Sequence, residues 1–358
     1  MTDNNEVKFI IDHIDPLGQG VFKKDEIIYF IPKTLPSESG NAKIYRSKKK
    51  IKFAKLDSLN NKSPQRIESP CEHYNDCNGC HFLHTNYENE IKIKEMALAR
   101  MASFDFDLDR VYVHPAPRRF HYRNRIQLHY DKSLNEIGFI NPQTKRIIAV
   151  PNCLMPQKDL AKSLKEFLKD WKSIAPSKSK GHVELYIKND ELNITWNERY
   201  ADSGFTQVFK EMNDKLKELV DSKLSASDKA LDLFGGDGNL SDKLEHKTVI
   251  DYYSDMSTHN HKVHLDLYKE KAYKQLDNGL DINTMIIDPP RKGFPLMESW
   301  VKEYNPEKII YVSCHSQTMF RDLKAIKSGY NLEELHLLDL FPSTYHFESM
   351  AVLKRNRT

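Results

Sequence analysis

The sequence lacks the features that mark membrane-spanning and secreted proteins. No apolar run in its 358 residues approaches the about 20 residues needed to span a bilayer. Its first residues, MTDNNEVKF, hold no apolar signal segment. The five cysteines are odd in number, which argues against a framework of disulfides. We therefore expect a protein of the reducing cytoplasm with no membrane partner.

Glycine and net charge are also low. Because there are only 13 glycines, a cluster of them indicates a backbone requirement at that place. The 54 basic residues nearly balance the 51 acidic ones, so the local distribution of charge says more about partners than the net charge of +3 does. A hydrophobic content of 39% and a charged content of 29% are typical of a globular chain, and the length suffices for two or three domains.

Strand and helix patterns succeed one another along the chain. Residues 6–57 are rich in β-branched and aromatic residues between turn signals, which predicts a small all-β unit, and residues 59–70 read as a linker. A helix is expected over residues 87–104 and strands over residues 119–150. An amphipathic helix (QKDLAKSLKEFLKDW) and a hairpin (HVELYIKN with ELNITWNE) follow.

From about residue 205 onward, short apolar strands alternate with helical patterns. This alternation predicts a mostly parallel α/β sheet. The run LDLFGGDGNLSDKL predicts a strand, a glycine-rich turn and a helix, and a ligand of such a sheet binds beyond the carboxyl ends of its strands. Gly235–Gly238 would let the backbone approach that ligand closely.

A dinucleotide fits this turn poorly. The run is G-G-D-G rather than G-x-G-x-x-G, and Asp237 would repel a pyrophosphate. S-adenosylmethionine (SAM) tolerates acidic surroundings better. Asp251 and Asp266 end the next two strands, where they could accept the ribose hydroxyls and lie near the adenine. An ordinary strand–turn–helix without a ligand is the structural alternative.

Four of the cysteines form a separate group. Three follow the spacing C-x5-C-x2-C in SPCEHYNDCNGC, and the fourth lies downstream in VPNC. Thiolates in fours bind zinc or iron–sulfur clusters, and nearby histidines leave a zinc site of three cysteines and one histidine open. Buried structural thiols without a metal are the third possibility. The residues concerned are Cys71, Cys77, Cys80 and Cys153, with His73, His81 and His84 beside them.

A carboxylate and the fifth thiol end two further strands. TMIIDPPRK places Asp288 after an apolar strand, where prolines end the pairing, and KIIYVSC delivers Cys314 to the same edge. Glu348 begins or precedes the last strand among apolar residues, so desolvation would raise its pKa toward that of a general base. An isolated thiol beside an acid is typical of a nucleophile with its base. A buried core thiol and a solvated strand-edge acid are the structural alternatives.

Together these motifs resemble the bacterial RNA 5-methyluridine methyltransferases, most closely the rRNA-specific branch that carries a TRAM domain and a [4Fe-4S] cluster. The resemblance covers almost the whole chain, from IDPLGQGVFKKDEIIYFIPKTLPSES to FPSTYHFES. It implies an α/β, Rossmann-like SAM-dependent methyltransferase domain, an N-terminal OB-like β-barrel (TRAM) and a small iron–sulfur α+β central domain. The implied boundaries are 1–60 for the TRAM domain, 61–86 and 118–200 for the central domain, and 87–117 and 201–358 for the methyltransferase domain.

The resemblance also implies the role of each matching residue. GFTQVF resembles the family's FxQ segment, LDLFGGDGN its LDLFCGxGN loop, VSCHSQT its VSCNP segment and FPSTYHFES its FPxTxHxE segment. Cys314 is then the nucleophile and Glu348 the base. The implied ligands of the [4Fe-4S] cluster are Cys71, Cys77, Cys80 and Cys153, and the implied SAM contacts are Gln207, Phe234, Asn239, Asp251, Asp266 and Asp288.

The implied reaction moves a methyl group from SAM to C5 of a uridine in RNA, with 23S rRNA favoured over tRNA. Cys314 would add to C6 of the uracil, Glu348 would remove the C5 proton, and Asp288 could hold the ring. The target base must leave its stack to reach the thiol. The chain is expected to act as a monomer.

Two basic, aromatic-bearing stretches are the expected RNA contacts, since cations meet phosphates while rings stack on unpaired bases. Either stretch alone could be a solvated face. The first comprises Lys43, Tyr45, Arg46, Lys48, Lys49 and Lys50, and the second Arg118, Arg119, Phe120, His121, Tyr122, Arg123 and Arg125.

The chain departs from the family pattern at three places. Segment 252–264 is shorter than usual, His315 and Ser316 replace an Asn-Pro pair, and Phe209 stands where Asn is common. The alternatives are a tRNA methyltransferase, a non-catalytic RNA-binding protein with a degenerate methyltransferase domain, and a zinc-bearing methyltransferase that acts on protein or DNA.

Overall fold

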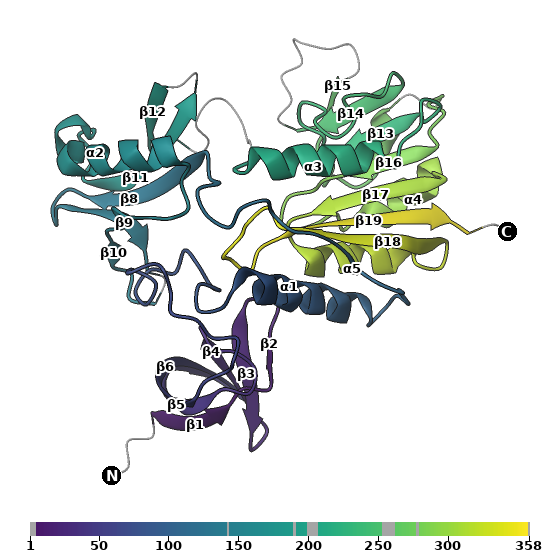
Figure 1. The fold of residues 1–358 in the computed structure, drawn as a ribbon. Helices are drawn as coiled ribbons and strands as arrows, with labels where there is room; N and C mark the ends of the chain where they lie inside the picture. The colour runs from purple at the N-terminus through teal and green to yellow at the C-terminus, as the bar shows by residue number, and fades with distance from the viewer. Residues whose placement is uncertain are drawn as a thin grey trace. The chain divides into compact units, whose positions relative to one another are not determined.

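The computed structural model describes residues 5–141, 143–188, 191–198, 207–252, 262–276 and 279–356. The chain forms two compact units, each assembled from separate stretches of sequence (Figure 1). The first unit contains Met1–Lys94, Pro117–Lys210 and Phe341–Tyr345, and the second contains the remainder. The predicted segment 252–264 falls largely outside the described residues.

The elements of the first unit are mostly strands. They are β1 (Glu6–Ile10), β2 (His13–Ile14), β3 (Gln19–Lys24), β4 (Ile27–Pro32), β5 (Ser39–Lys48), β6 (Ile51–Asn61), β8 (Arg125–Asp131), β9 (Glu136–Ile140), β10 (Ile147–Ile148), α2 (Lys158–Ile174), β11 (Lys180–Lys188) and β12 (Glu191–Trp196). Helix α1 (Tyr87–Ala102) and helix α3 (Lys210–Asp221) each begin in this unit and end in the other.

The second unit alternates strands with short helices. Its elements are β7 (Tyr112–His114), β13 (Ala230–Leu233), β14 (Lys247–Asp251), β15 (Lys262–His264), the 3-10 helix η2 (Ala272–Gln275), β16 (Thr284–Ile287), α4 (Met297–Tyr304), β17 (Lys308–Ser313), α5 (Ser316–Ile326), β18 (Tyr330–Leu338) and β19 (Glu348–Arg355). Within the described residues, no helix combines the length and the apolarity that crossing a membrane requires.

Strands β1 to β6 form one sheet in the order β1-β5-β6-β4-β3-β2, which we call the N-terminal sheet. Its inward side chains, among them Phe9, Ile31 and Ala42, are almost completely buried and form a core of their own. The predicted all-β unit over residues 6–57 is confirmed. Strand β6 continues to Asn61, so the linker begins a few residues later than predicted.

A five-stranded sheet of order β10-β9-β8-β11-β12 lies in the same unit. Strands β11 and β12 pair antiparallel as the predicted hairpin. Helix α2 repeats apolar residues at helical spacing, and Leu160, Leu164, Phe167 and Trp171 form a shared core with this sheet. Both predictions for this region are therefore confirmed.

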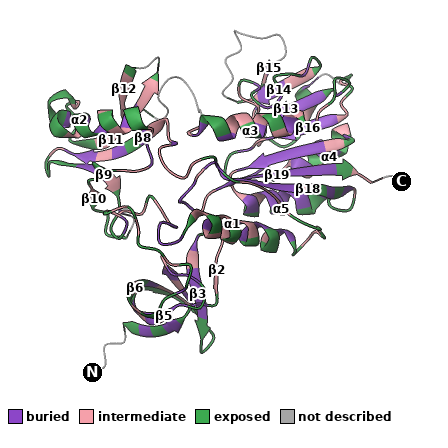
Figure 2. Cartoon of the chain, viewed as in Figure 1, coloured by how far each residue is buried: buried purple, intermediate pink, exposed green. Residues whose placement is uncertain are grey.

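The second unit is built on an eight-stranded sheet of order β15-β14-β13-β16-β17-β19-β18-β7. Five of its seven strand pairs are parallel, and only the two pairs made by β19 are antiparallel. The central strands are almost continuously buried, as Figure 2 shows. Such runs are typical of strands covered on both faces, and the predicted mostly parallel α/β sheet is confirmed.

The helix predicted directly after the glycine-rich turn is wrong. Residues 234–243 form a succession of turns that leads into β14. Phe234, Gly236 and Gly238 have φ values of 62°, 54° and 79°, which lie in the left-handed region and cannot continue a right-handed helix. Few residues remain before β14 begins at Lys247, and a short helix leaves most of its backbone groups without partners.

The core between α2 and the five-stranded sheet yields a stability prediction. Leu164 is fully buried there, so Leu164→Ala should lower the free energy of unfolding by about 3 kcal/mol through lost apolar contact and a residual cavity. The exposed neighbour Lys165 is the control, and Lys165→Ala should stay within about 0.5 kcal/mol. Urea unfolding followed by the fluorescence of Trp171 and Trp196, which belong to this core, measures both. Equal midpoints for the two variants would contradict the packing.

Candidate active site

Strand β19 brings Glu348 to Cys314. Strands β17 and β19 pair antiparallel, with Ser313 opposite Ser349. Continuing this register by one residue places Cys314, which directly follows β17, opposite Glu348. Residues opposite one another in an antiparallel pair have Cα atoms about 4.5–5.5 Å apart and side chains on the same face. The thiol and the carboxyl therefore face the same side at adjoining strand ends.

Asp288 joins them from the neighbouring strand. It directly follows β16, which pairs in parallel with β17, so the carboxyl ends of both strands lie at one edge of the sheet. Its main-chain N–H donates to the carbonyl of Leu233, 3.2 Å away, which fixes the start of the following loop. The predicted juxtaposition of a carboxylate and a thiol at two adjacent strand ends is confirmed.

The structure adds Arg291, which the sequence analysis did not single out. Its guanidinium interacts with Cys314 through charge and a hydrogen bond, and it also interacts electrostatically with Glu348. The signal in the sequence was its position in DPPRK, three residues after Asp288 and before Cys314. A cation at this place is the natural partner of a thiolate.

Helix α5 holds the loop that carries Arg291. Thr318 donates to the carbonyl of Arg291 at 3.2 Å, and Asp322 accepts the N–H of Phe294 at 2.5 Å. Gly293 has a φ of +72°, and a Cβ there would lie 2.5 Å from the Asp322 carboxylate. Only glycine satisfies both conditions, so the loop geometry depends on this residue.

The electrostatics of the site disfavour charge on its acids and its thiol. Burial, followed by the negative charge of Glu348, raises the pKa of Cys314 to about 12, and Arg291 opposes this shift. Burial and then the charge of Asp288 raise the pKa of Glu348 well above its usual range. Burial, with Asp232 and Asp251, raises the pKa of Asp288 to about 7. Burial and like charge thus favour the uncharged forms of all three groups, and perturbed groups of this kind are typical of functional sites.

The glycine-rich turn lies at the end of β13, between β14 and β16. One oxygen of Asp251 accepts the N–H of Gly236 at 3.0 Å, which holds the turn open. A Cβ added to Gly236 would meet nothing within 4 Å, so space is available above the turn. Phe234 packs against Tyr268 and Phe294, with ring centroids 5.4 and 5.1 Å apart. This surface suits a ligand that combines apolar and hydrogen-bonding parts.

The other predicted SAM contacts are distributed between both units. In the second unit, Asn239 donates to Asn213 at 3.4 Å, and Asp266 follows β15 and accepts the N–H of Tyr268 at 3.1 Å. Gln207 belongs to the first unit, where its carbonyl accepts from Asn124 at 3.2 Å. Their roles toward a ligand stay predictions.

The four clustered cysteines lie in the first unit as free thiols, each partly exposed. Cys80 interacts electrostatically with the other three, and burial is the main cause of its raised pKa. The N–H of Gly79 donates to the sulfur of Cys77 at 3.4 Å, and the N–H of Met155 to that of Cys153. Such N–H donors stabilise thiolates and the sulfurs of clusters. Among the described residues, no three or more His, Cys, Asp or Glu side chains lie in an arrangement that could hold a single metal ion.

His84, one of the predicted alternative zinc ligands, has other partners. Its Nδ1 lies 2.6 Å from the Tyr74 hydroxyl, and its Nε2 lies 3.4 Å from the carbonyl of Thr34. Burial lowers the pKa of His84 to about 3, so the ring is neutral. This histidine links the cysteine-bearing segment to the N-terminal sheet.

In the second stretch of predicted RNA contacts, the prediction is wrong for Tyr122, and Arg119 has a partner within the fold. Tyr122 is completely buried, stacks on Phe209 at 4.8 Å and donates to the carbonyl of Pro342. Arg119 forms an ion pair at 2.9 Å with Glu90, which is fully buried. Rings and cations so placed stabilise the fold. The first stretch differs, since Tyr45 is 46% exposed and its basic neighbours are exposed too.

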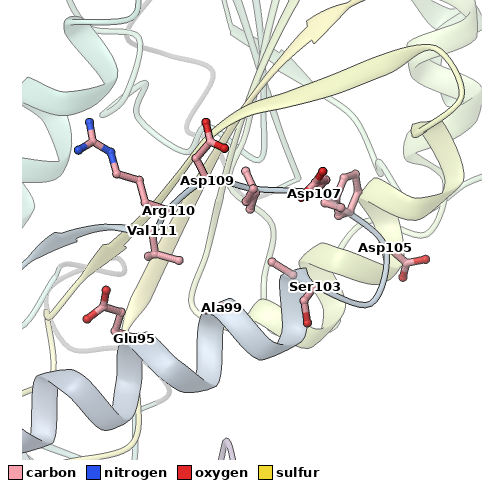
Figure 3. Close-up of a pocket in the computed structure, with 11 residues that line it drawn as sticks. Glu95, Ala99, Ser103, Asp105, Asp107, Asp109, Arg110 and Val111 are labelled. Carbon is pink, nitrogen blue, oxygen red and sulfur yellow. The ribbon is translucent and has the colours of Figure 1, made fainter.

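A cavity of about 690 Å³ lies beside the end of α1 in the second unit. Figure 3 shows the carboxylates of Asp105, Asp107 and Asp109 on the segment that lines it. None of the predicted site residues lines this cavity. Asp105 pairs with Lys324 at 2.9 Å, so the charge of this carboxylate is balanced within the fold.

Comparison with known families confirms the predicted resemblance. A family model described as tRNA (uracil-5-)-methyltransferase matches residues 261–356. These residues include Asp288, Arg291, Cys314 and Glu348. The expectation that the chain is an enzyme of this class is confirmed with it.

Two relatives carry the similarity over nearly the whole chain. Both are named 23S rRNA (uracil(1939)-C(5))-methyltransferase RlmD; the Shewanella woodyi protein is 26% identical, covering 98% of this chain and 96% of its own. The Aliivibrio fischeri protein is 28% identical, covering 96% and 94%. The alignment with the Shewanella woodyi protein is 436 positions long, whereas this chain has 358 residues, so the alignment contains gaps in this chain.

One solved structure shares the fold. The Pyrococcus abyssi tRNA (uracil-54, C5)-methyltransferase, solved in complex with S-adenosyl-L-homocysteine, aligns with a TM-score of 0.69. It is 21% identical, and the match covers 97% of this chain and 100% of that chain. The overall architecture is therefore that of a known methyltransferase fold.

The contact between Arg291 and Cys314 predicts a change in thiol reactivity. Arg291→Ala removes the cation that favours the thiolate, so the pKa of Cys314 should rise further and its alkylation by iodoacetamide at pH 8 should slow by about three- to tenfold. The rate is measured by mass spectrometry of the peptide that contains Cys314. Arg100→Ala on the exposed face of α1 serves as the control. An unchanged pH profile in Arg291→Ala would contradict the assigned contact.

Proposed function

We propose that this enzyme transfers the methyl group of SAM to C5 of a specific uridine in RNA, with 23S rRNA as the favoured substrate. The observation that carries the proposal is the register of β17 and β19, which sets Cys314 opposite Glu348. A thiol and a carboxyl on one face, next to Asp288 and Arg291, suit addition to a pyrimidine followed by proton removal. The relatives named for uracil-C5 methylation of 23S rRNA support the choice of substrate.

The glycine-rich turn at the end of β13 is the proposed SAM site. The open space above Gly236 and the apolar ring of Phe234 fit a sulfonium ligand with an adenine. Asp251, Asp266 and Asn239 would supply hydrogen bonds to it. SAM supplies an electrophilic methyl group, which the unactivated C5 of uracil cannot take.

Cys314 is proposed to solve this difficulty by covalent catalysis. Its thiolate adds to C6 of the uracil, and the electron pair of the C5–C6 bond moves toward C5 and the ring carbonyl. C5 is thereby made nucleophilic enough to accept the methyl group. Asp288 would hold the ring by hydrogen bonds. Arg291 would favour the thiolate before the addition.

Glu348 would complete the reaction. After methylation C5 carries both the methyl group and its original proton. Glu348, ionised at that stage, removes the proton; the electrons restore the C5–C6 bond, and Cys314 leaves as a thiolate. Its burial gives the carboxylate the high basicity that this step needs.

The cluster of cysteines is proposed to hold a [4Fe-4S] cluster in a structural role. Four thiols that interact with one another, and N–H donors to Cys77 and Cys153, fit four sulfur ligands. The uridine chemistry needs no electron. Such a cluster would instead bind residues 71–80 to residue 153. Zinc is the alternative, and the iron and zinc contents of anaerobically purified protein decide between them.

The N-terminal sheet is proposed to be a TRAM domain (residues 1–60) that binds RNA. Exposed Tyr45 and its basic neighbours offer stacking and charge. Residues 61–86 and 118–200 would form the iron–sulfur domain, and residues 87–117 and 201–358 the methyltransferase domain. We further propose that the protein acts as a monomer in the cytoplasm.

The two catalytic roles predict opposite outcomes for two variants. Cys314→Ala should abolish both methylation and the covalent protein–RNA adduct, because no other group can activate C5. Glu348→Gln should accumulate that adduct, since the methylated uridine can no longer lose its proton. Denaturing gels with labelled RNA detect the adduct. Glu333→Gln, at an exposed position of β18, is the control. Turnover by Cys314→Ala, or normal product release by Glu348→Gln, would refute the mechanism.

The substrate is tested separately by mapping 5-methyluridine in cells that lack the gene. We expect one position in 23S rRNA to lose its methyl group while tRNA is unchanged. Complementation with the native gene should restore the modification, and complementation with Cys314→Ala should not. Loss in tRNA with an unchanged 23S rRNA would select the tRNA alternative, for which the fold of the Pyrococcus abyssi protein is a precedent.

A further inference from the structure

Lys33 has an unusual backbone conformation directly after β4. Its φ is 64°, in the left-handed region, where a residue with a Cβ is less favourable than glycine. The guanidinium of Arg66 donates to its carbonyl at 2.8 Å and also binds the fully buried Glu38. The backbone is therefore held in this conformation by its surroundings. A glycine would meet the backbone requirement better, so replacement of Lys33 by glycine removes the side chain without straining the backbone.

The side chain of Lys33 reaches the loop between the first two clustered cysteines. Its ammonium donates to the carbonyl of Tyr74 and, at 3.3 Å, to that of Asn75. It also lies 4.5 Å from the centroid of the Tyr74 ring, a cation–π distance. The next carbonyl, that of Asp76, accepts from Asn141 in the turn between β9 and β10 at 2.8 Å. The loop is thus held from the N-terminal sheet and from the five-stranded sheet.

The ammonium also interacts with the thiols themselves. Lys33 lies close enough to Cys77 and Cys80 for favourable electrostatic interaction with both. Arg123 interacts in the same way with Cys80 and Cys153. Four thiolates around a cluster carry net negative charge, which neighbouring cations stabilise. Residues outside the ligand set commonly determine how firmly a metal site holds its metal.

We propose that Lys33 is a positioning residue that couples the N-terminal sheet to the iron–sulfur cluster, by holding the Tyr74–Asn75 backbone and balancing the charge of the Cys77 and Cys80 thiolates. This inference rests on the [4Fe-4S] cluster proposed above. It makes cluster retention depend on a residue of the RNA-binding sheet. Loss of the cluster would in turn release the contact between that sheet and the cysteine loop.

The test compares glycine substitutions at two left-handed lysines. Lys33→Gly relieves the backbone and removes the ammonium, so the sheet should stay folded while the cluster is lost in air about tenfold faster than in the unmodified protein. Lys49 has a φ of 53° in the same sheet and is exposed, so Lys49→Gly is matched in conformation and in charge. Iron content and the decay of the cluster's visible absorbance measure retention, and circular dichroism checks folding.

Two further readouts separate charge from general structure. The reduction potential of the cluster should become more negative in Lys33→Gly, because a nearby positive charge no longer favours the added electron, whereas Lys33→Arg should keep both potential and retention near those of the unmodified protein. Equal decay and equal potential in the Lys33→Gly and Lys49→Gly proteins would overturn the proposal. Absence of iron from the unmodified protein would overturn it together with the cluster. Neither result bears on the adduct assay for Cys314, which tests the methyltransferase reaction alone.

Discussion

The active site depends on one pairing, that of β19 with β17. A wholly parallel sheet would bring only the carboxyl ends of its strands to the ligand edge. Because β19 runs antiparallel between β17 and β18, it contributes its amino end to the same edge. Glu348, the first residue of β19, thereby meets Cys314, the residue after the end of β17. A slip of one residue in this register would turn Glu348 to the other face of the sheet, so the burial of β19 on both sides also protects the alignment of the two groups.

The same burial sets the chemistry of the pair. Few water molecules reach these groups, so the pKa of the carboxyl rises and the thiol resists ionisation. Each group therefore favours its uncharged form. Arg291 opposes both shifts, and its position depends on α5, Gly293 and Asp322 rather than on the sheet. The strands thus provide alignment and desolvation, while the loop after β16 provides the compensating charge.

The local sequence was sufficient to predict a feature of the structure where that feature lay within one strand or one helix. The apolar periods of α2 and of the central strands, and the placement of Asp288 and Cys314 at strand ends, could be read directly. It was insufficient where the outcome depended on packing between distant segments. Tyr122 and Arg119 look like RNA contacts in a basic, aromatic run, yet Tyr122 stacks on Phe209 and Arg119 pairs with the buried Glu90. The prediction of a helix after Phe234 was wrong because left-handed residues at Phe234, Gly236 and Gly238 cannot continue a right-handed helix. Arg291 was missed because nothing in DPPRK reveals that the loop folds back toward the thiol.

The group of four cysteines and the isolated Cys314 also differ in their surroundings. Cys77 and Cys153 receive backbone N–H groups, and cations from separate elements face the group of four. Burial nevertheless raises the pKa of Cys77, Cys80 and Cys153, so these donors and cations oppose the shift without removing it. Cys314 faces an acid on the opposing strand and is countered by a single arginine on an exposed loop. This arrangement suits the nucleophile that we propose, which adds to a base and leaves again. In the proposed function, the group of four holds a structural cluster, while Cys314 takes part in the reaction.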